Sequence, residues 1–286
     1  MLVATEAKPL LPKPSPKNKI DKIRLDQLVA SLGLAESGSQ AQALIMAGRV
    51  LVDDTPMTKP GHQVPGDAKL RVKGKQHRFV GRGGVKLAHA LQHFGQHFGK
   101  HFQQDSGQDS GFSPRDCTAL DIGSSTGGFT DVLLKEGAKQ VIAVDVGHGQ
   151  LDWRLRQDKR VVVLERTNAR YLTADMIGDR LVDWVVCDVS FISLKKVLPA
   201  ALALVREGGW LVALIKPQFE VGKGQVGKGG VVRDAKLQAE VVADMEAWLA
   251  DHDGGAWQVK GVVESPITGA DGNREFFIAG VKKRAG

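Results

Sequence analysis

The hydrophobic positions in the last two thirds of the chain fall into short, continuous, strand-sized runs separated by helical or turn segments. Parallel strands that are buried on both faces give runs of this kind, so the alternation predicts an open α/β sheet with helices on both faces. Two final runs have no helix between them, which predicts an antiparallel strand at one edge of the sheet. The runs are Ala119–Ile122, Val141–Val146, Val161–Leu164, Trp184–Cys187, Leu211–Ile215, Val259–Val263 and Phe276–Val281.

The first third has a different pattern. Apolar residues recur at helical spacing over Arg24–Gly33, and a second helix is predicted over Gln40–Ala47. Short strands at Val50–Val52 and Lys69–Val72 are predicted around a turn at Asp53-Asp54. Two short helices and a few short strands predict a small α+β module that folds separately from the sheet domain.

These patterns divide the chain into a Lys- and Pro-rich tail (1–21), the α+β module (22–78) and the α/β domain (79–286). The tail is expected to be disordered. A helix is predicted over Val85–Gln92 at the start of the last part. Residues 93–115 then repeat HFG and QDSG in tandem, which is typical of a low-complexity insert.

Histidines at positions 89, 93, 97 and 101 would share one face of a helix. Such a row could bind a transition metal, but Gly95 and Gly99 weaken the helix and tandem repetition alone produces the spacing. We therefore predict a linker here and no metal site.

Composition narrows the class of protein. The chain has 286 residues with 42% hydrophobic residues, which is enough for a packed core. No apolar run approaches the roughly 18 residues of a membrane span, and no secretory signal precedes the module. Two cysteines, Cys117 and Cys187, cannot form a disulfide framework. These features predict a cytoplasmic protein.

The net charge of +7 is unevenly distributed. Residues 1–86 hold 15 Lys and Arg against 7 Asp and Glu, whereas residues 87–286 hold 24 against 25. A basic module before a neutral domain predicts an anionic partner for the first and separate chemistry for the second, although a solvated basic surface would look the same.

The first candidate site is Asp121-Ile-Gly-Ser-Ser-Thr-Gly-Gly-Phe129, which follows a predicted strand and opens a helix. A nucleotide-like cofactor binds at this place in open α/β sheets. Asp145 ends the next strand 24 residues after Asp121, where a carboxylate can hold a ribose diol. The turn lacks the G-x-G-x-x-G spacing of a dinucleotide site, so the pattern favours S-adenosylmethionine over NAD. Asn168, after the following strand, is a candidate adenine contact or a turn residue.

The second candidate site pairs Asp188 with Lys216, each directly after a buried run. Both side chains should reach the carboxyl edge of the sheet, as a functional couple or as a structural ion pair. The segment Gly222–Gly229 has glycines like a phosphate-binding loop, but it lacks the Ser or Thr that would ligate Mg²⁺. We interpret it as a basic loop whose Lys223 and Lys228 contact an RNA backbone.

Together these segments resemble a known family. The stretches Cys187-Asp-Val-Ser-Phe-Ile-Ser-Leu194, Lys216-Pro-Gln-Phe-Glu-Val-Gly222 and Arg82-Gly-Gly-Val-Lys-Leu87 are similar to the TlyA-like (hemolysin-A-like) ribosomal RNA methyltransferases. Arg24–Asp26 and Ala43–Val50 are similar to the S4 RNA-binding domain that this family joins to an FtsJ-like, Rossmann-type methyltransferase domain. The resemblance extends from about residue 23 to residue 281.

The resemblance implies S-adenosylmethionine-dependent 2′-O-methylation of cytidine in ribosomal RNA. It also implies a catalytic tetrad at Lys86, Asp188, Lys216 and Glu275. We hypothesise that Lys216 removes the proton of the ribose hydroxyl, that Asp188 and Glu275 orient it, and that Lys86 holds the ribose or a flanking phosphate. A lysine acts as a base when it is partly neutral, which burial and a second lysine promote.

The remaining expected contacts follow from the turn and from the basic positions. The predicted cofactor contacts are Asp121, Gly123, Ser124, Ser125, Thr126, Gly127, Gly128, Phe129, Asp145, Asn168 and Asp188, and the predicted RNA contacts are Lys22, Arg24, Arg49, Lys59, Arg82, Lys223 and Lys228. The expected partner is ribosomal RNA within ribosomal subunits, with no membrane. The alternatives are an RNA-binding factor with a silent methyltransferase fold, or a pore-forming hemolysin.

Overall fold

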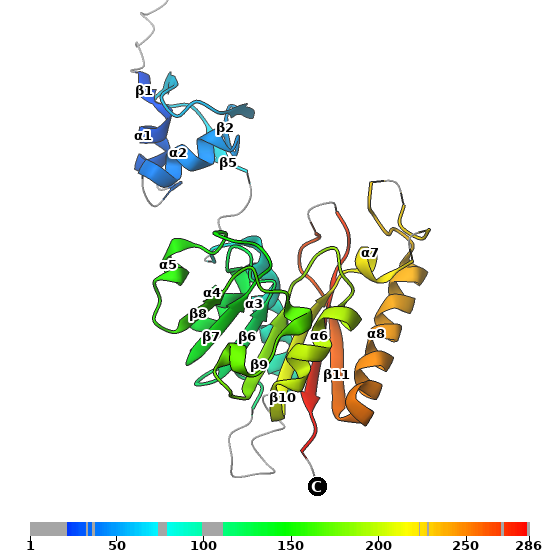
Figure 1. Cartoon of the computed structure of the whole chain (residues 1–286). Helices are drawn as coiled ribbons and strands as arrows, with labels where there is room; N and C mark the ends of the chain where they lie inside the picture. Colours follow the sequence, from blue (N-terminus) through cyan, green and yellow to red (C-terminus); the bar gives the residue numbers. More distant parts are fainter. Residues whose placement is uncertain are drawn as a thin grey trace, which may run out of the picture. The chain divides into compact units, whose positions relative to one another are not determined.

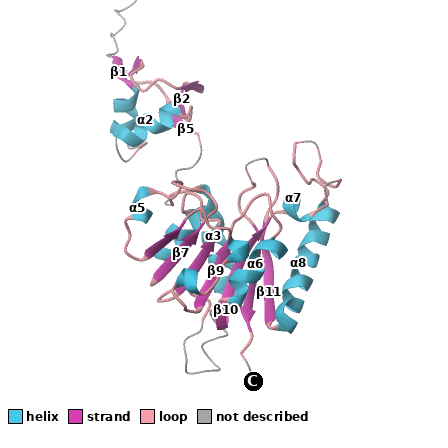
Figure 2. Cartoon of the chain, viewed as in Figure 1, coloured by secondary structure: helices cyan, strands magenta, loops and turns pink. Residues whose placement is uncertain are grey.

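The computed structural model describes residues 22–32, 34–35, 38–73, 79–98, 111–222, 224–227, 229–269 and 272–284 (Figures 1 and 2). The chain divides into an N-terminal unit, Met1–Gln76, and a C-terminal unit, His77–Gly286. The predicted tail and Gly33, at the end of the first predicted helix, lie outside the described residues.

The N-terminal unit contains the two predicted helices and more strands than the sequence indicated. Its elements are β1 (Lys22–Arg24), α1 (Leu25–Ser31), α2 (Gly38–Met46), β2 (Val50–Val52), β3 (Thr55–Met57), β4 (Gln63–Pro65) and β5 (Leu70–Val72). Asp53 and Asp54 both have positive φ and join the antiparallel pair β2 and β3, so the predicted turn is the tight connection of a hairpin. Leu25, Val29 and Ile45 from the helices are fully buried with Val50, and this gives the unit its own core.

The C-terminal unit is built on a seven-stranded sheet in the order β11-β12-β10-β9-β6-β7-β8. Its strands are β6 (Thr118–Ile122), β7 (Gln140–Val144), β8 (Val161–Leu164), β9 (Val182–Cys187), β10 (Val205–Ile215), β11 (Trp257–Glu264) and β12 (Phe276–Lys282). All seven predicted runs are strands, which confirms the mostly parallel α/β fold. The predicted position of the antiparallel strand was wrong: β12 lies between β10 and β11, because the second strand of the final hairpin pairs with β10 and leaves β11 at the edge.

Helices cover both faces of this sheet (Figure 1). The helices are α3 (Arg82–Phe98), α4 (Gly128–Lys135), α5 (Trp153–Arg156), α6 (Leu194–Ala203), α7 (Pro217–Glu220) and α8 (Ala235–Gly255), with short 3-10 turns at Ala169–Tyr171 and Asp175–Ile177. Helices α3 and α4 pack on one face with the indole rings of Trp184 and Trp210, and α6 and α8 pack on the other. Because β10, β9, β6, β7 and β8 are parallel to one another, their carboxyl ends lie at one common edge of the sheet.

The helix α3 continues past its predicted end at Gln92, so the expected start of the insert at residue 93 is corrected. Phe94 is 2% exposed and lies against Phe98 and Phe112, with ring centroids 6.0 and 5.8 Å away. This aromatic packing offsets the roughly 1 kcal/mol by which a glycine such as Gly95 disfavours a helix interior. Residues 99–110 of the predicted insert lie outside the described residues.

Candidate active site

The turn between β6 and α4 needs glycine at two positions, because other atoms occupy the space that a Cβ would take. Gly123 has φ +81°, and a Cβ there would lie 2.6 Å from the backbone oxygen of Asp188. Gly127 has φ +95°, and a Cβ there would lie 2.2 Å from Leu155 Cδ1. The backbone of the turn therefore lies directly against the segment that carries Asp188.

Asp145 follows β7 and holds the same turn from the neighbouring strand. Its Oδ2 accepts a hydrogen bond from the Ser125 N–H at 2.8 Å, and its Oδ1 accepts one from the Gly147 N–H at 2.7 Å. Each carboxylate oxygen can accept a second hydrogen bond. Asp145 lines a cavity, so it can hold the turn and bind a pair of hydroxyl groups at the same time.

Two adjoining cavities lie beside the turn, one of about 540 Å³ and one of about 200 Å³. Both are lined by Gly123, Ser125, Asp188 and Ser190. A divided cleft of this size suits an elongated small molecule. The predicted cofactor residues that line one cavity or both are Gly123, Ser124, Ser125, Thr126, Gly128, Phe129, Asp145, Asn168 and Asp188.

Asp121 and Gly127 line neither of these two cavities. Asp121 lies in β6 beneath the turn, has no exposed surface, and accepts a hydrogen bond from Thr130 Oγ1 at 2.6 Å through its Oδ2. Burial raises the pKa of Asp121 to about 7, and the nearby carboxylates of Asp188 and Asp145 add to the shift. Asp121 thus joins β6 to α4 and supports the turn from below, and its contact with the cofactor stays a prediction.

Lys216 and Asp188 meet at the carboxyl edge of the sheet. The Lys216 Nζ lies 2.6 Å from Asp188 Oδ1, off the direction that a hydrogen bond to this oxygen requires, and it donates a hydrogen bond to Ser190 Oγ at 3.0 Å. Both side chains line the smaller cavity, although the Lys216 side chain is only 10% exposed. The Lys216 amine is thus held beside a carboxylate where the two cavities join.

Lys86 and Glu275 form a second buried ion pair, with Nζ and Oε2 2.5 Å apart. Lys86 is on α3 and Glu275 immediately precedes β12. Ile215 pairs with Phe276 in the antiparallel pair β10 and β12. Lys216 and Glu275, one position beyond this pair, therefore lie at the same end of the sheet. The hypothesis that Glu275 orients Lys216 is therefore corrected, because the ionic partner of Glu275 is Lys86.

The segment after Asp188 contains residues that the sequence reasoning missed. Ser190 accepts the hydrogen bond from Lys216 and lines both cavities. Phe191 has φ +66°, is 91% exposed, and lines the larger cavity. Their position in the sequence, shortly after the strand-ending Asp188, could have marked Ser190 and Phe191 as candidates. The sequence does not show, however, that the backbone turns there.

Some of the side chains predicted to contact RNA form hydrogen bonds within the protein, and others do not. Arg24 donates two hydrogen bonds to Asp26, and Arg49 donates two to the backbone oxygen of Lys73. Arg82 donates one to the backbone oxygen of Thr268. The side chains of Lys22 and Lys59 have no hydrogen-bond or ion-pair partner among the described residues. The predicted contacts Lys223 and Lys228 lie outside the described residues.

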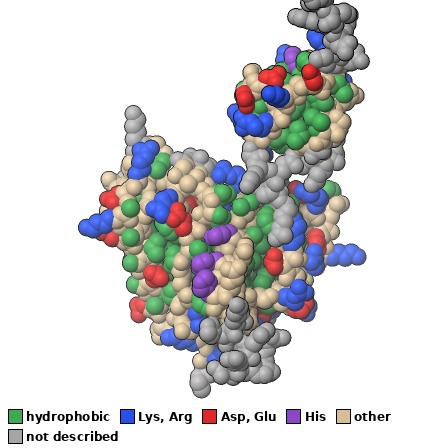
Figure 3. Space-filling model, turned by 180° about the vertical axis from the view of Figure 1, so that it is seen from behind, with side chains coloured by type: hydrophobic (Ala, Val, Ile, Leu, Met, Phe, Trp, Pro, Cys, Tyr) green, Lys and Arg blue, Asp and Glu red, His purple; other side chains and the backbone are tan. Residues whose placement is uncertain are grey.

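Histidines form a row on one face of the C-terminal unit, as Figure 3 shows. The rings of His93 and His97 are 4.5 Å apart between centroids, and those of His89 and His93 are 6.4 Å apart. Within the described part of the chain, no group of three or more metal-ligating side chains converges. His101 lies outside that part.

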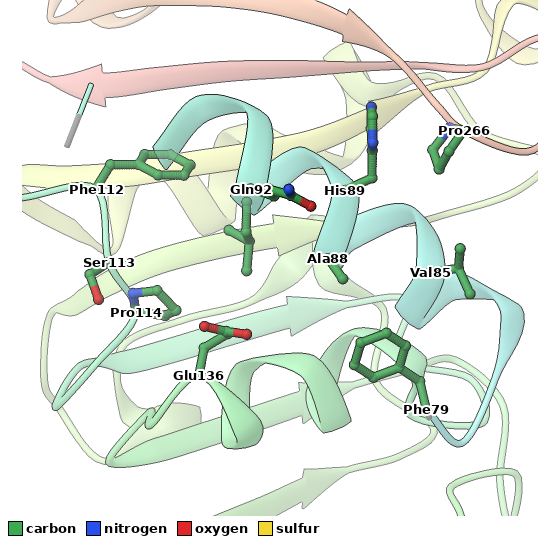
Figure 4. A pocket seen from close by; sticks show the side chains of 11 residues that line it. Phe79, Val85, Ala88, His89, Gln92, Phe112, Ser113, Pro114, Glu136 and Pro266 are labelled. Atoms are coloured by element: carbon green, nitrogen blue, oxygen red, sulfur yellow. The ribbon is translucent and has the colours of Figure 1, made fainter. Parts of the chain in front are cut away.

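A larger cavity of about 650 Å³ lies along α3, away from the glycine-rich turn (Figure 4). It is lined by Phe79, Val85, Gln92, Glu136 and Pro266, among others. None of the predicted catalytic or cofactor residues lines it. Size alone would have pointed to this place, whereas the convergent polar groups lie at the turn.

Family models match both units. The FtsJ-like methyltransferase model matches residues 79–282, and the S4 domain model matches residues 23–70. The matched ranges agree with the change from an α+β module to an α/β sheet.

Several known proteins are similar over most of their length. The 16S/23S rRNA (cytidine-2'-O)-methyltransferase TlyA of Mycobacterium tuberculosis is 47% identical over 90% of this chain and 89% of its own. Hemolysin A of Brachyspira hyodysenteriae is 39% identical over 89% and 98%. A solved structure from Streptococcus thermophilus, described as a hemolysin, is 40% identical with a TM-score of 0.67 and covers 93% of this chain and 90% of its own. No helix among the described residues is long and apolar enough to span a bilayer.

Proposed function

Because the chain belongs to the TlyA family of FtsJ-like methyltransferases, we propose that it methylates the 2′-hydroxyl of a cytidine in ribosomal RNA. The observation that carries the proposal is the Lys216–Asp188 ion pair at the junction of two cavities beside the glycine-rich turn. An amine at that place is suited to take a proton from a hydroxyl group next to a bound cofactor.

The cleft fits S-adenosylmethionine, which supplies an electrophilic methyl group on a sulfonium when bound. Asp145 can hold the ribose diol, and Asn168, which lines the same cavity, can contact the adenine. The turn offers close backbone approach without the glycine spacing that binds a pyrophosphate. Asp188 places negative charge near the site of the cationic sulfur.

Each residue of the tetrad has a distinct part in the proposal. Lys216, as the neutral amine, takes the proton from the 2′-hydroxyl while the hydroxyl oxygen bonds to the methyl carbon, and the carbon–sulfur bond of the cofactor would break with its electron pair left on the sulfur. Asp188 and Ser190 hold the Lys216 amine in place through the contacts described above. Glu275 holds Lys86, whose ammonium orients the ribose or a flanking phosphate.

The S4 domain supplies RNA affinity in this proposal. The side chains of Lys22 and Lys59 are among its free cations in the described part of the chain, and phosphate contacts by such residues give binding that depends on salt. We propose ribosomal RNA within ribosomal subunits as the substrate, and therefore the cytoplasm as the place of action.

Methyl transfer from labelled S-adenosylmethionine to unmodified ribosomal subunits tests the proposal. After digestion of the RNA, we expect label in 2′-O-methylcytidine for the natural protein. For Lys216→Ala we expect a loss of about 100-fold or more, as removal of a proton acceptor predicts, with cofactor affinity measured by calorimetry retained.

Label on a base would overturn the assigned reaction while leaving the methyltransferase fold. Full turnover by Lys216→Ala would overturn the role of Lys216. Absence of label on both subunits and on bare RNA, with the cofactor bound, would indicate an RNA-binding factor with a silent catalytic domain.

A further inference from the structure

Two segments of the proposed active site run side by side and contact each other at successive positions. One follows β9 from Asp188 to Leu194, and the other follows β10 from Lys216 to Glu220. The Lys216–Asp188 and Lys216–Ser190 contacts join them at the cleft. Farther along, the rings of Phe191 and Phe219 lie 5.1 Å apart between centroids.

Glu220 connects the two segments at the end farthest from Lys216. Its Oε2 accepts a hydrogen bond from Ser193 Oγ at 2.5 Å, and its Oε1 accepts one from the Leu194 N–H at 2.8 Å. Ser193 Oγ also accepts a hydrogen bond from the Lys195 N–H at 3.2 Å, as the N-cap of α6. The carboxylate therefore fixes the place where the Asp188 segment becomes a helix.

We infer that Glu220 is a positioning residue, which keeps the Asp188 segment in register with Lys216 and so sets the place of Ser190 at the junction of the two cavities. The inference rests on the proposed function, in which Lys216 is the proton acceptor. Five consecutive residues, Asp188 to Ile192, line the larger cavity. They are held at one end by Lys216 and, immediately after Ile192, by Glu220.

A purely structural role for Glu220 predicts a different outcome from a positioning role. Loss of support for a helix cap lowers stability and leaves the activity of the folded protein unchanged. Misplacement of a proton acceptor by a fraction of an ångström to 1 Å lowers kcat by about 10- to 100-fold. The distinction therefore lies in kcat at saturating substrate, measured where every variant is folded.

The experiment compares Glu220→Ala and Glu220→Gln in the full chain with Glu240→Ala. Glu240 is an exposed residue of α8 that lies 3.9 Å from Lys236. For Glu220→Ala we expect kcat to fall at least tenfold with KM for ribosomal RNA within about twofold. Glu220→Gln retains an oxygen for the Leu194 N–H, so we expect it to recover kcat to within about threefold of the natural protein. Glu240→Ala should match the natural protein.

An unchanged kcat in Glu220→Ala would overturn the inference and leave the proposed function standing. A kcat that falls only in proportion to the folded fraction would overturn it as well. Hydrogen exchange at the Leu194 amide gives a second readout that does not depend on methyl transfer. Exchange at least tenfold faster in Glu220→Ala than in Glu240→Ala supports the positioning role of Glu220 even if the natural protein proves inactive. Equal exchange in the two variants overturns it.

Discussion

Asp121 carries a titratable group at a place where charge is unfavourable. The side chain is fully buried, one of its oxygens accepts a hydrogen bond from Thr130, and the other has no partner among the described residues. Burial raises its pKa from 3.8 to about 7. The folded protein therefore binds this proton more tightly than the unfolded chain does, and ionisation at neutral pH lowers the free energy of unfolding.

We expect Asp121→Asn to be stabilised relative to the natural protein by an amount that grows with pH. Below about pH 4 the carboxyl is protonated in both states, so the raised pKa has no effect. Between about pH 4 and pH 7 the unfolded chain loses the proton first, and the natural protein loses stability that the amide variant keeps. Urea denaturation at pH 5 and pH 8 measures the difference, and a difference independent of pH would contradict the pKa assigned to Asp121.

The packing of α3 decides the placement of Lys86. Its first turn approaches the start of α4 so closely that a Cβ on Gly128 would lie 2.8 Å from the Gly84 backbone nitrogen. The Lys86–Glu275 ion pair then ties α3 to the start of β12. Two elements that are far apart in sequence are joined through one buried pair of charges.

We expect Glu275→Gln to lower the free energy of unfolding by about 3 kcal/mol, because it leaves the Lys86 ammonium buried without its counter-charge. The Lys86→Met/Glu275→Gln double variant removes both charges and should recover at least half of that loss. Urea denaturation of Glu275→Gln, Lys86→Met, the double variant and the natural protein gives the comparison. A double variant as unstable as the sum of its single changes would show that the two residues act independently.

In the proposed function, the N-terminal unit binds RNA and the C-terminal unit carries out methyl transfer. The N-terminal unit has its own core and holds the free Lys22 and Lys59, while the cavities and both buried ion pairs belong to the C-terminal unit. The positive charge of the chain is likewise concentrated in the first 86 residues.

We expect Lys22→Ala/Lys59→Ala to raise KM for ribosomal RNA and leave kcat unchanged, because the lost contacts are with phosphates rather than with the reacting hydroxyl. The plot of log affinity against log salt concentration should become shallower by roughly 1 to 2. Lys236→Ala, on α8, is the control for loss of a lysine outside the N-terminal unit. An unaltered salt slope in the double variant would place the RNA contacts elsewhere.

The sequence predicted the site more accurately at the turn than at the tetrad. Residues of one turn are neighbours because the chain connects them. The turn residues from Gly123 to Phe129 other than Gly127, together with the strand-ending Asp145 and Asp188, could therefore be assigned to one cleft from spacing alone. The ionic partner of Glu275 could not be assigned, because it depends on how α3 packs.

The sequence by itself determined the strands of the sheet domain, the division into a basic module and a sheet domain, and the polar residues at the carboxyl edge. These follow from periodicity and chain connectivity, which are local. Only the tertiary structure decided that β12 lies inside the sheet, that α3 continues through Phe94, that Asp121 is buried, and that Glu220 joins two active-site segments. Each of these depends on which distant surfaces pack together. That packing is decided by the burial and charge pairing of residues far apart in the sequence, which the spacing of residues along the chain does not reveal.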